Sequence, residues 1–303
     1  ATTTGTIYQT NKTEDGSTVY YYSGNTTNNW VKFAGFYWRI IRTNEDKSVR
    51  MLYAGTSHNT TSGYMAASTY NSSLNNPMYV GYMYGTSGSL ANNRTNTSNS
   101  SIKTKIDTWY QNNLLTNYDK YISKTAIYCN DRSVGSGTYS TSSSFDYAGH
   151  TRISANKTPS YKCGADTNNG LFESTQAVAD KFSVSTDGGG NGKLTYPIAL
   201  MTADELSFAG GVWSMNLSSP YAWFYTNSNG NSIASNTAWW LLTPDRWRNS
   251  SSSVLIISDY PVGDYSNAGP MSNLDIDRTI NVRPAISLKS CVEYSSGNGT
   301  PES

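Results

Sequence analysis

Apolar and polar residues alternate over short runs of the chain, which is the pattern of half-buried β-strands. The clearest run is 48–55, where the apolar side chains at every second position from Val49 to Tyr53 share one face. Together with the aromatic and β-branched run 30–43 and the turn at 44–47, it predicts a β-hairpin. Further strands are expected at 18–22, 237–243, 252–258 and 279–288.

Two helices are predicted between the early and the late strands. Over residues 101–115, apolar residues recur at the i, i+4 and i+7 spacing of one helix face. A short helix at 203–209 begins with the capping-box pair Thr202 and Glu205. The rest is predicted to be loop, with the longest irregular stretches at 56–100, 133–147 and 183–193.

These elements predict an α+β protein made of antiparallel sheets, two helices and extensive irregular loops. The early hairpin and the late strands have no other partners, so the two ends of the chain are expected to pair in one sheet. No internal repeat or composition shift divides the 303 residues. We therefore expect a polar N-terminal segment at 1–16, one domain with long insertions at 17–290 and a flexible tail at 291–303.

The composition is typical of an exported surface protein rather than of a cytosolic enzyme. Charged residues make up only 14% of the chain, whereas there are 24 tyrosines and many Asn, Ser and Thr residues. Such residues are typical of binding surfaces, but they also suit the strands and turns of any β-rich extracellular protein. A net charge of +1 without a basic stripe argues against nucleic acid as a partner. No apolar run is long enough for membrane insertion.

The three cysteines predict one disulfide and no metal site. Cys129 and Cys163 enclose a loop rich in Ser, Gly and Thr, which a disulfide would tether; two buried free thiols are the alternative. Cys291 is the odd cysteine and is expected to be free. No C-x₂-C spacing supports a zinc site.

Six segments, taken in order, resemble a family of surface proteins from Gram-positive gut bacteria. They are WVKFAGFYWRIIRTNEDKSVRMLYAG, YVGYMYG, YCNDRS, YPIALMTADELSFAGG, AWWLLTPDRW and INVRPAISL. The strongest signals are Trp-Trp-x-Leu-[Ser/Thr]-Pro, ending at Pro244, and Val-Arg-Pro-x-[Ile/Leu]-Ser-Leu, starting at Val282. The resemblance covers about 17–290. It implies a C-type-lectin-like fold, in the group that contains formylglycine-generating enzymes and the variable proteins of diversity-generating retroelements.

The resemblance also implies where a ligand would bind. In the retroelement-diversified members, the substituted positions lie between the Trp-Trp strand and the Arg-Pro strand and form a solvent-facing surface. In this chain that surface corresponds to about 245–278. The candidate ligand-binding residues are Asp245, Arg246, Trp247, Arg248, Asn249, Asp259, Tyr260, Asp264, Tyr265, Asn273, Asp275 and Asp277.

Four residues beside this surface are predicted to be structural: Trp239, Trp240, Arg283 and Pro284. The tryptophans belong to the strand that carries the binding surface. A proline within an apolar run indicates an edge strand or a strand start. A buried arginine needs a carboxylate or carbonyl partner, so Arg283 is interpreted as structural rather than functional.

The residues that could support catalysis have simpler explanations. His58 and His150 lie in loop contexts without a nucleophile elbow or an activated cysteine. Asp204 and Glu205 form an acidic pair, but acidic groups in the first turn of a helix stabilise its dipole. The protein is therefore not expected to be an enzyme.

No cofactor is predicted, although a calcium site stays open as an alternative. Asp259, Asp264, Asp275 and Asp277 could supply oxygen ligands for Ca²⁺, but their spacing is not that of an EF-hand loop. The sugar-binding signatures of calcium-dependent lectins are absent.

The expected function is extracellular ligand binding or adhesion, on a bacterial cell surface or a phage virion. The partner would be a protein or glycan on another cell or on a phage or host surface, bound through a surface that retroelements can diversify. The alternative is a structural module of a cell-surface or phage-tail assembly; an unrecognised enzyme comes third. Convergence of the charged and aromatic side chains of 245–278 on one exposed patch favours the binding function.

Overall fold

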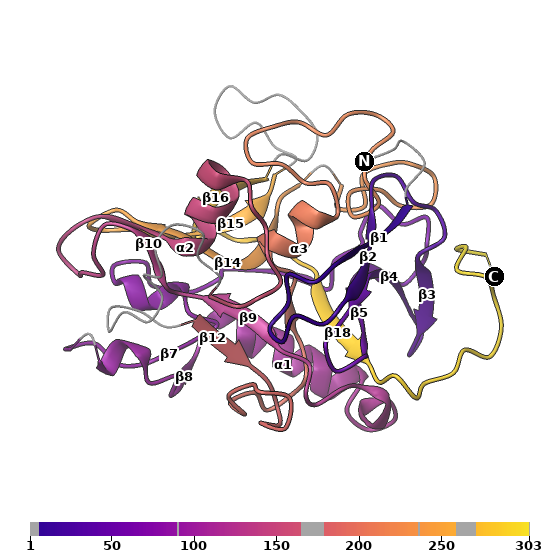
Figure 1. The fold of residues 1–303 in the computed structure, drawn as a ribbon, viewed down its shortest axis with the longest axis horizontal. Helices are drawn as coiled ribbons and strands as arrows, with labels where there is room; N and C mark the ends of the chain where they lie inside the picture. Colours follow the sequence, from indigo (N-terminus) through magenta and orange to yellow (C-terminus); the bar gives the residue numbers. More distant parts are fainter. Residues whose placement is uncertain (1–5, 90, 165–178, 236, 259–270, 303) are drawn as a thin grey trace.

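Two large sheets, whose strands come from distant parts of the sequence, dominate the computed structural model (Figure 1). The structure describes residues 6–89, 91–164, 179–235, 237–258 and 271–302. Mostly antiparallel strands and a few helices give the α+β class that the sequence pattern predicts. Within these ranges, no helix is both long and apolar enough to cross a membrane.

The first sheet joins the two ends of the chain. Over the described residues its order is β1-β2-β4-β5-β18-β13, with β3 beside β4. The C-terminal strand β18 pairs antiparallel with β5, and Ala285 lies opposite Leu52. This pairing confirms that the two ends meet in one sheet. The bounds are β1 (Thr6–Thr10), β2 (Val19–Ser23), β3 (Trp30–Phe33), β4 (Phe36–Thr43), β5 (Val49–Gly55), β13 (Ala199–Leu200) and β18 (Pro284–Leu288).

The second sheet comes mainly from the C-terminal third of the chain. Its order over the described residues is β10-β11-β14-β15-β16, and β17 joins β14 to β6. Two of its strands, β10 and β11, lie in the stretch 133–147 that was predicted to be a loop. That prediction was wrong because β11 gains its strand conformation by pairing with β14. The bounds are β6 (Ala66–Ser68), β10 (Val134–Ser136), β11 (Phe145–Tyr147), β14 (Trp239–Trp247), β15 (Ser252–Ile257), β16 (Met271–Asp275) and β17 (Ile280–Val282).

Smaller elements complete the fold. Helix α1 (Ser101–Asn113) begins at Ser100, whose side chain accepts a hydrogen bond from the Lys103 amide. Helix α3 (Ala203–Phe208) has both hydrogen bonds of the predicted capping box. The other elements are α2 (Ala148–His150), a π-helical turn (Thr151–Asn156), 3₁₀ turns (Pro77–Val80, Asn92–Arg94, Asp119–Tyr121) and the strand pairs β7 (Met83–Tyr84) with β8 (Ser98–Asn99) and β9 (Tyr128–Asp131) with β12 (Ala179–Phe182).

A disulfide ties β9 to the segment that precedes β12. It links Cys129 and Cys163, as the sequence predicts, and Cys291 is a free, exposed thiol. The bond closes a long loop and so restricts the unfolded chain. Close to Cys163, the Ser160 amide donates a hydrogen bond to Asp204 of α3 (2.9 Å). The disulfide and this hydrogen bond together hold residues 160–163 beside α3.

Alkylation of the folded protein without reductant is expected to label one thiol, at Cys291. The labelled residue can be located by intact mass followed by peptide mapping. After reduction and unfolding, the same reagent should label three thiols, which serves as the control. Three labels on the folded, unreduced protein would contradict the disulfide.

Candidate functional site

One face of the second sheet carries a row of polar side chains. In the strand register, Asp146 of β11 lies opposite Arg246 of β14, Arg246 lies opposite Ser253 of β15, and Ser253 lies opposite Asp275 of β16. Residues directly opposite each other in antiparallel strands point to the same side of the sheet. Asn273, two positions before Asp275 on β16, points to that side as well. We call Asp146, Arg246, Ser253, Asn273 and Asp275 the polar face.

A buried carboxylate lies under this face. Pro244 has no N–H to donate, and the register between β14 and β15 shifts on both sides of it. The shift turns the side chain of Asp245, which is fully buried, toward the neighbouring strand. There Asp245 accepts a hydrogen bond from Ser253 Oγ (2.8 Å), contacts Nε of Arg246 (2.9 Å) and pairs with Nδ1 of His150. Asp245 was predicted to contact a ligand, but its burial means that it positions neighbouring side chains instead.

Two arginines of this region are accessible to solvent. Arg246 and Arg248 expose 27% and 43% of their side chains, whereas Asp245 exposes none. Arg248 Nη2 pairs with Asp146 Oδ1 at 2.8 Å, and Asp146 also lies 4.0 Å from Arg246 Nε. Asp245 thus contacts Arg246 from the buried side, and Asp146 lies near both arginines. Both guanidinium groups stay accessible to a ligand.

His150 and Trp213 extend the polar face beyond the predicted segment. The rings of His150 and Trp213 meet edge to face, with centroids 5.1 Å apart. Nη2 of Arg246 lies 3.2 Å from Nε2 of His150, so the arginine and the tryptophan flank the same imidazole. Sequence reasoning missed these contacts because His150 precedes Arg246 by 96 residues and no local pattern signals their pairing.

Trp247 differs from its prediction as a ligand contact. It is 1% exposed, and it pairs with Phe145 and Ser252 across the sheet. Since side chains alternate between the two faces of a strand, Arg246 points outward and Trp247 points into the core. Trp247 is therefore part of the hydrophobic core of the sheet.

The other predicted contacts are distributed as follows. Arg248 and Asn249 are exposed in the turn between β14 and β15, and Asp277 is exposed after β16. Asp275 is partly buried; its pKa is raised by burial and by the nearby charge of Asp277. The candidates that lie outside the described residues are Asp259, Tyr260, Asp264 and Tyr265.

The four structural candidates lie in the interior. Trp239 and Trp240 are buried, and Nε1 of Trp240 donates to the Ser68 carbonyl (2.9 Å). Buried Arg283 donates to backbone carbonyls, those of Tyr53 (3.1 Å) and Phe224 (2.6 Å). Pro284 is the first residue of β18. These positions match the predicted strand start and the predicted need of Arg283 for carbonyl or carboxylate partners.

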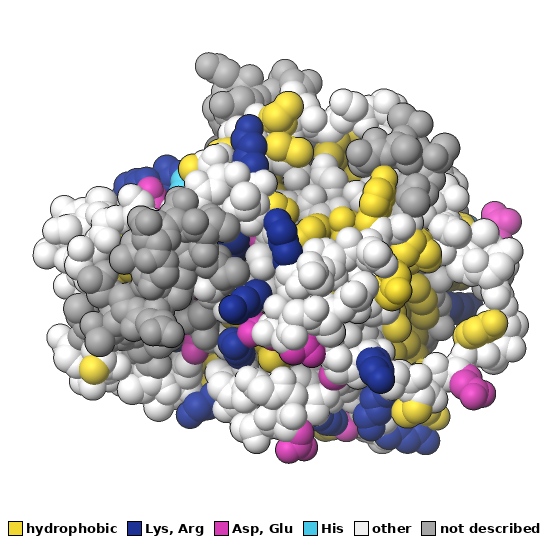
Figure 2. All heavy atoms as spheres, viewed as in Figure 1, with side chains coloured by type: hydrophobic (Ala, Val, Ile, Leu, Met, Phe, Trp, Pro, Cys, Tyr) yellow, Lys and Arg dark blue, Asp and Glu magenta, His cyan; other side chains and the backbone are white. Residues whose placement is uncertain are grey.

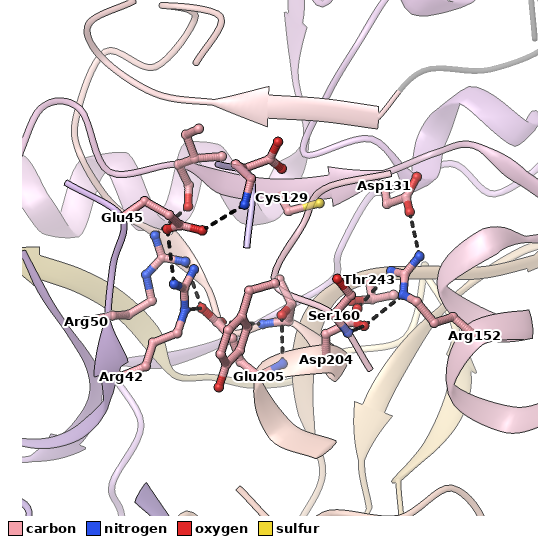
Figure 3. Close-up of a pocket in the computed structure, with 14 residues that line it drawn as sticks. Arg42, Glu45, Arg50, Cys129, Asp131, Arg152, Ser160, Asp204, Glu205 and Thr243 are labelled. Carbon is pink, nitrogen blue, oxygen red and sulfur yellow. Dashed lines mark hydrogen bonds and ion pairs between the residues drawn. The ribbon is translucent and has the colours of Figure 1, made fainter. Parts of the chain in front are cut away.

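A small hollow beside α3 is lined by several charged side chains (Figure 3). Glu205 Oε1 pairs with Arg42 Nε (3.1 Å) and Arg50 Nη1 (2.8 Å), and its Oε2 accepts from the Thr202 amide (3.0 Å). Burial raises the pKa of Glu205, but Arg50, Arg42 and the Thr202 amide outweigh this effect, so the pKa is lowered. The carboxylate is held ionised and fully engaged, which suits a structural role rather than proton transfer.

The second acidic residue of α3 is engaged in the same way. Asp204 forms a two-pronged pair with Arg152, through Nε (2.8 Å) and Nη2 (2.9 Å), and Arg152 also pairs with Asp131 (3.0 Å). These partners join α3 to β9 and to the π-helical turn. The acidic pair at 204–205 therefore crosslinks the fold, in addition to the position in the first turn of the helix that the sequence predicts.

His58 and potential metal ligands offer no alternative site. Nδ1 of His58 contacts Ser228 Oγ at 2.7 Å, and the Ser228 amide donates to the His58 carbonyl (2.9 Å), so the contact fastens two loops to each other. In the described ranges no carboxylate pairs with His58. Among the described residues, no group of three or more His, Cys, Asp or Glu side chains is placed to hold a metal ion.

Comparison of the chain with protein-family models, with curated proteins and with solved structures finds no match in any of the three. The site is therefore interpreted from its own geometry. Outward-facing arginines sit over a buried carboxylate, with a polar row on one side and a tryptophan on the other. This arrangement can bind a ligand in a fixed orientation.

Proposed function

We propose that the protein is an extracellular ligand-binding or adhesion protein with a C-type-lectin-type scaffold. In this proposal the polar face, together with Arg248, binds a protein or glycan on another cell or on a phage or host surface. The disulfide is compatible with a location outside the cytoplasm, where such bonds persist. The resemblance of the Trp-Trp and Arg-Pro segments supports the scaffold type, because both segments are buried strands here.

The observation that carries this proposal is the convergence of separate predicted contacts on one side of the sheet. Arg246, Asn273 and Asp275 share the polar face through the strand register, and Arg248 joins them through Asp146. A structural module has no need to leave two arginines exposed, one of them paired with a fully buried carboxylate. Preorganised arginines are, by contrast, common among the residues that dominate binding energy.

Removing the arginines is expected to abolish ligand capture at some cost in stability, while the protein stays folded because the Asp245 carboxylate keeps Ser253 and His150 as partners. A variant with Arg246→Ser and Arg248→Ser loses two exposed donor groups, and the loss of about 1–2 kcal/mol at each lowers affinity by roughly 30- to 1000-fold. Capture is measured on a panel of glycans, bacterial cells and phage particles. Circular dichroism is recorded for every variant.

The matched control is Tyr294→Ser, which changes a side chain that is 84% exposed in the C-terminal tail. Capture by this variant should equal that of the parent. If the arginine variant captures the ligand as well as the parent does, the binding surface lies elsewhere. If the parent captures nothing from the panel, the alternative as a structural module of a surface or phage-tail assembly is favoured.

A further inference from the structure

An apolar loop borders the polar face. Val212 and Met215 expose 38% and 56% of their surface, and Trp213 and Leu217 are partly exposed between and after them. We call residues 212–217 the apolar loop. Figure 2 shows apolar side chains reaching the surface in the upper part of the molecule, where Figure 1 places the chain that follows α3. Clustered exposure of large aliphatic groups marks interaction sites in soluble proteins.

The apolar loop is held firmly by the sheet beside it. Trp213 forms a parallel bridge with Met271, the Ser214 amide donates to the Met271 carbonyl (3.0 Å), and the Met271 amide donates to the Val212 carbonyl (3.4 Å). Ser214 has a φ of 53°, in the left-handed region that residues other than glycine rarely occupy. This turn is stabilised by its hydrogen bonds, so Val212 and Met215 are presented in a fixed arrangement.

Contacts between side chains connect the apolar loop to the exposed cations. Trp213 packs against His150, the guanidinium of Arg246 lies against the same imidazole, and Arg248 follows through Asp146. Arg246 and Arg248 are both accessible here, whereas the carboxylates that pair with them are Asp245, which is fully buried, and Asp146, which is 26% exposed. The segment that carries Val212 and Met215 is thus linked, through Trp213 and His150, to an accessible guanidinium group.

Building on the proposed function, we propose that the ligand is a protein whose surface places apolar side chains on Val212 and Met215 and carboxylates on Arg246 and Arg248. Covering aliphatic surface contributes about 25 cal/mol per Å² when the covering groups are apolar. The hydroxyl groups of a glycan would instead lose water against Val212 and Met215 without gaining hydrogen bonds. An apolar centre with a charged rim is the anatomy of a protein–protein interface.

The test uses a phage-displayed random peptide library selected on the folded, full-length protein. Selected peptides are synthesised, and their dissociation constants are measured against the parent and three variants. The variants are Val212→Ser with Met215→Ser, Arg248→Glu, and the control Tyr294→Ser. Exposed substitutions of this kind change stability by about 0.5 kcal/mol or less, and thermal unfolding verifies that each variant is folded.

The expected peptides combine Asp or Glu with Leu, Ile, Phe or Trp. Their affinity should fall about tenfold or more for the double serine variant. For Arg248→Glu it should fall about fivefold to tenfold, with the loss smaller at high salt because screening weakens the added repulsion. Tyr294→Ser should leave it unchanged. Two results would overturn the proposal of a protein partner. They are selected peptides without acidic residues, and peptide affinities that the double serine variant does not alter.

A glycan array run in parallel separates this inference from the proposed function. One outcome is that the parent captures a glycan, that Arg246→Ser with Arg248→Ser loses this capture, and that the double serine variant keeps it. This outcome would overturn the proposal of a protein partner but leave the proposed binding function standing. If the parent binds neither peptides nor glycans at this surface, both the inference and the proposed function fail.

Discussion

Replacement of Trp247 by alanine is expected to destabilise the protein by about 3–5 kcal/mol, because truncating a large buried aromatic side chain leaves a cavity. Trp247 is 1% exposed at the end of β14, where it pairs with Phe145 and Ser252. Trp240→Ala, at the other end of the same strand, should cost a similar amount. Urea unfolding followed by circular dichroism measures both. A loss of this size is a large fraction of the stability of a typical domain.

The matched control for Trp247 is its neighbour Arg248, which is 43% exposed. Arg248→Ala should change the free energy of unfolding by about 0.5 kcal/mol or less, as surface substitutions usually do. If Trp247→Ala unfolds at the same urea concentration as Arg248→Ala, the alternation of β14 between core and polar face is wrong. The position of the candidate site would then be wrong as well.

Glu205→Gln is expected to cost about 3–5 kcal/mol, because it leaves two buried guanidinium groups without their shared carboxylate. Arg42 and Arg50 both pair with Oε1 of Glu205, and all three side chains are at most 5% exposed. The control is Glu45→Gln, since Glu45 is 20% exposed and, within the described part of the chain, its ion pair is with Arg42 (3.3 Å). Its cost should be about 1 kcal/mol or less. Equal costs for the two variants would contradict a shared, buried ion pair.

The ion pairs of Glu205 also predict that the free energy of unfolding depends on pH. Because the pKa of Glu205 is lowered in the folded protein, its stabilisation is fully present above the ordinary glutamate pKa and is lost as the pH falls through the lowered value. The difference in unfolding free energy between the parent and Glu205→Gln should therefore shrink between neutral pH and about pH 3. A difference that stays constant over this range would show that the carboxylate does not titrate differently on folding.

Much of the fold follows from local patterns in the sequence. The early hairpin alternates in polarity, and it forms as β4 and β5. The helical spacing at 101–115 becomes α1, and the capping box at Thr202 starts α3. These elements are predictable because neighbouring residues decide which side chains share a face and which backbone groups are capped. The disulfide was predictable for a related reason, since Cys129 and Cys163 flank one long loop.

The division between scaffold and binding surface was not predictable in this way. The sequence pattern places the end of the strand before Asp245, but β14 continues to Trp247 because β11 and β15 pair with it on both sides. Pairing with β11 is a contact between segments about a hundred residues apart, and local propensity does not encode such a partner. Once β14 is extended, Arg246 must face outward and Trp247 inward.

The sequence by itself thus determined the α+β class, the joining of the two chain ends, the disulfide, and a candidate surface after the Trp-Trp strand. Only the tertiary structure decided which of those surface residues can meet a ligand. Asp245 became a buried anchor because the irregular register around Pro244 turns it toward Ser253 and His150. His150 and Trp213 became neighbours of Arg246 because strand pairing and the bridge to Met271 bring three distant segments together. Such contacts depend on the register of whole sheets, which no short stretch of sequence specifies.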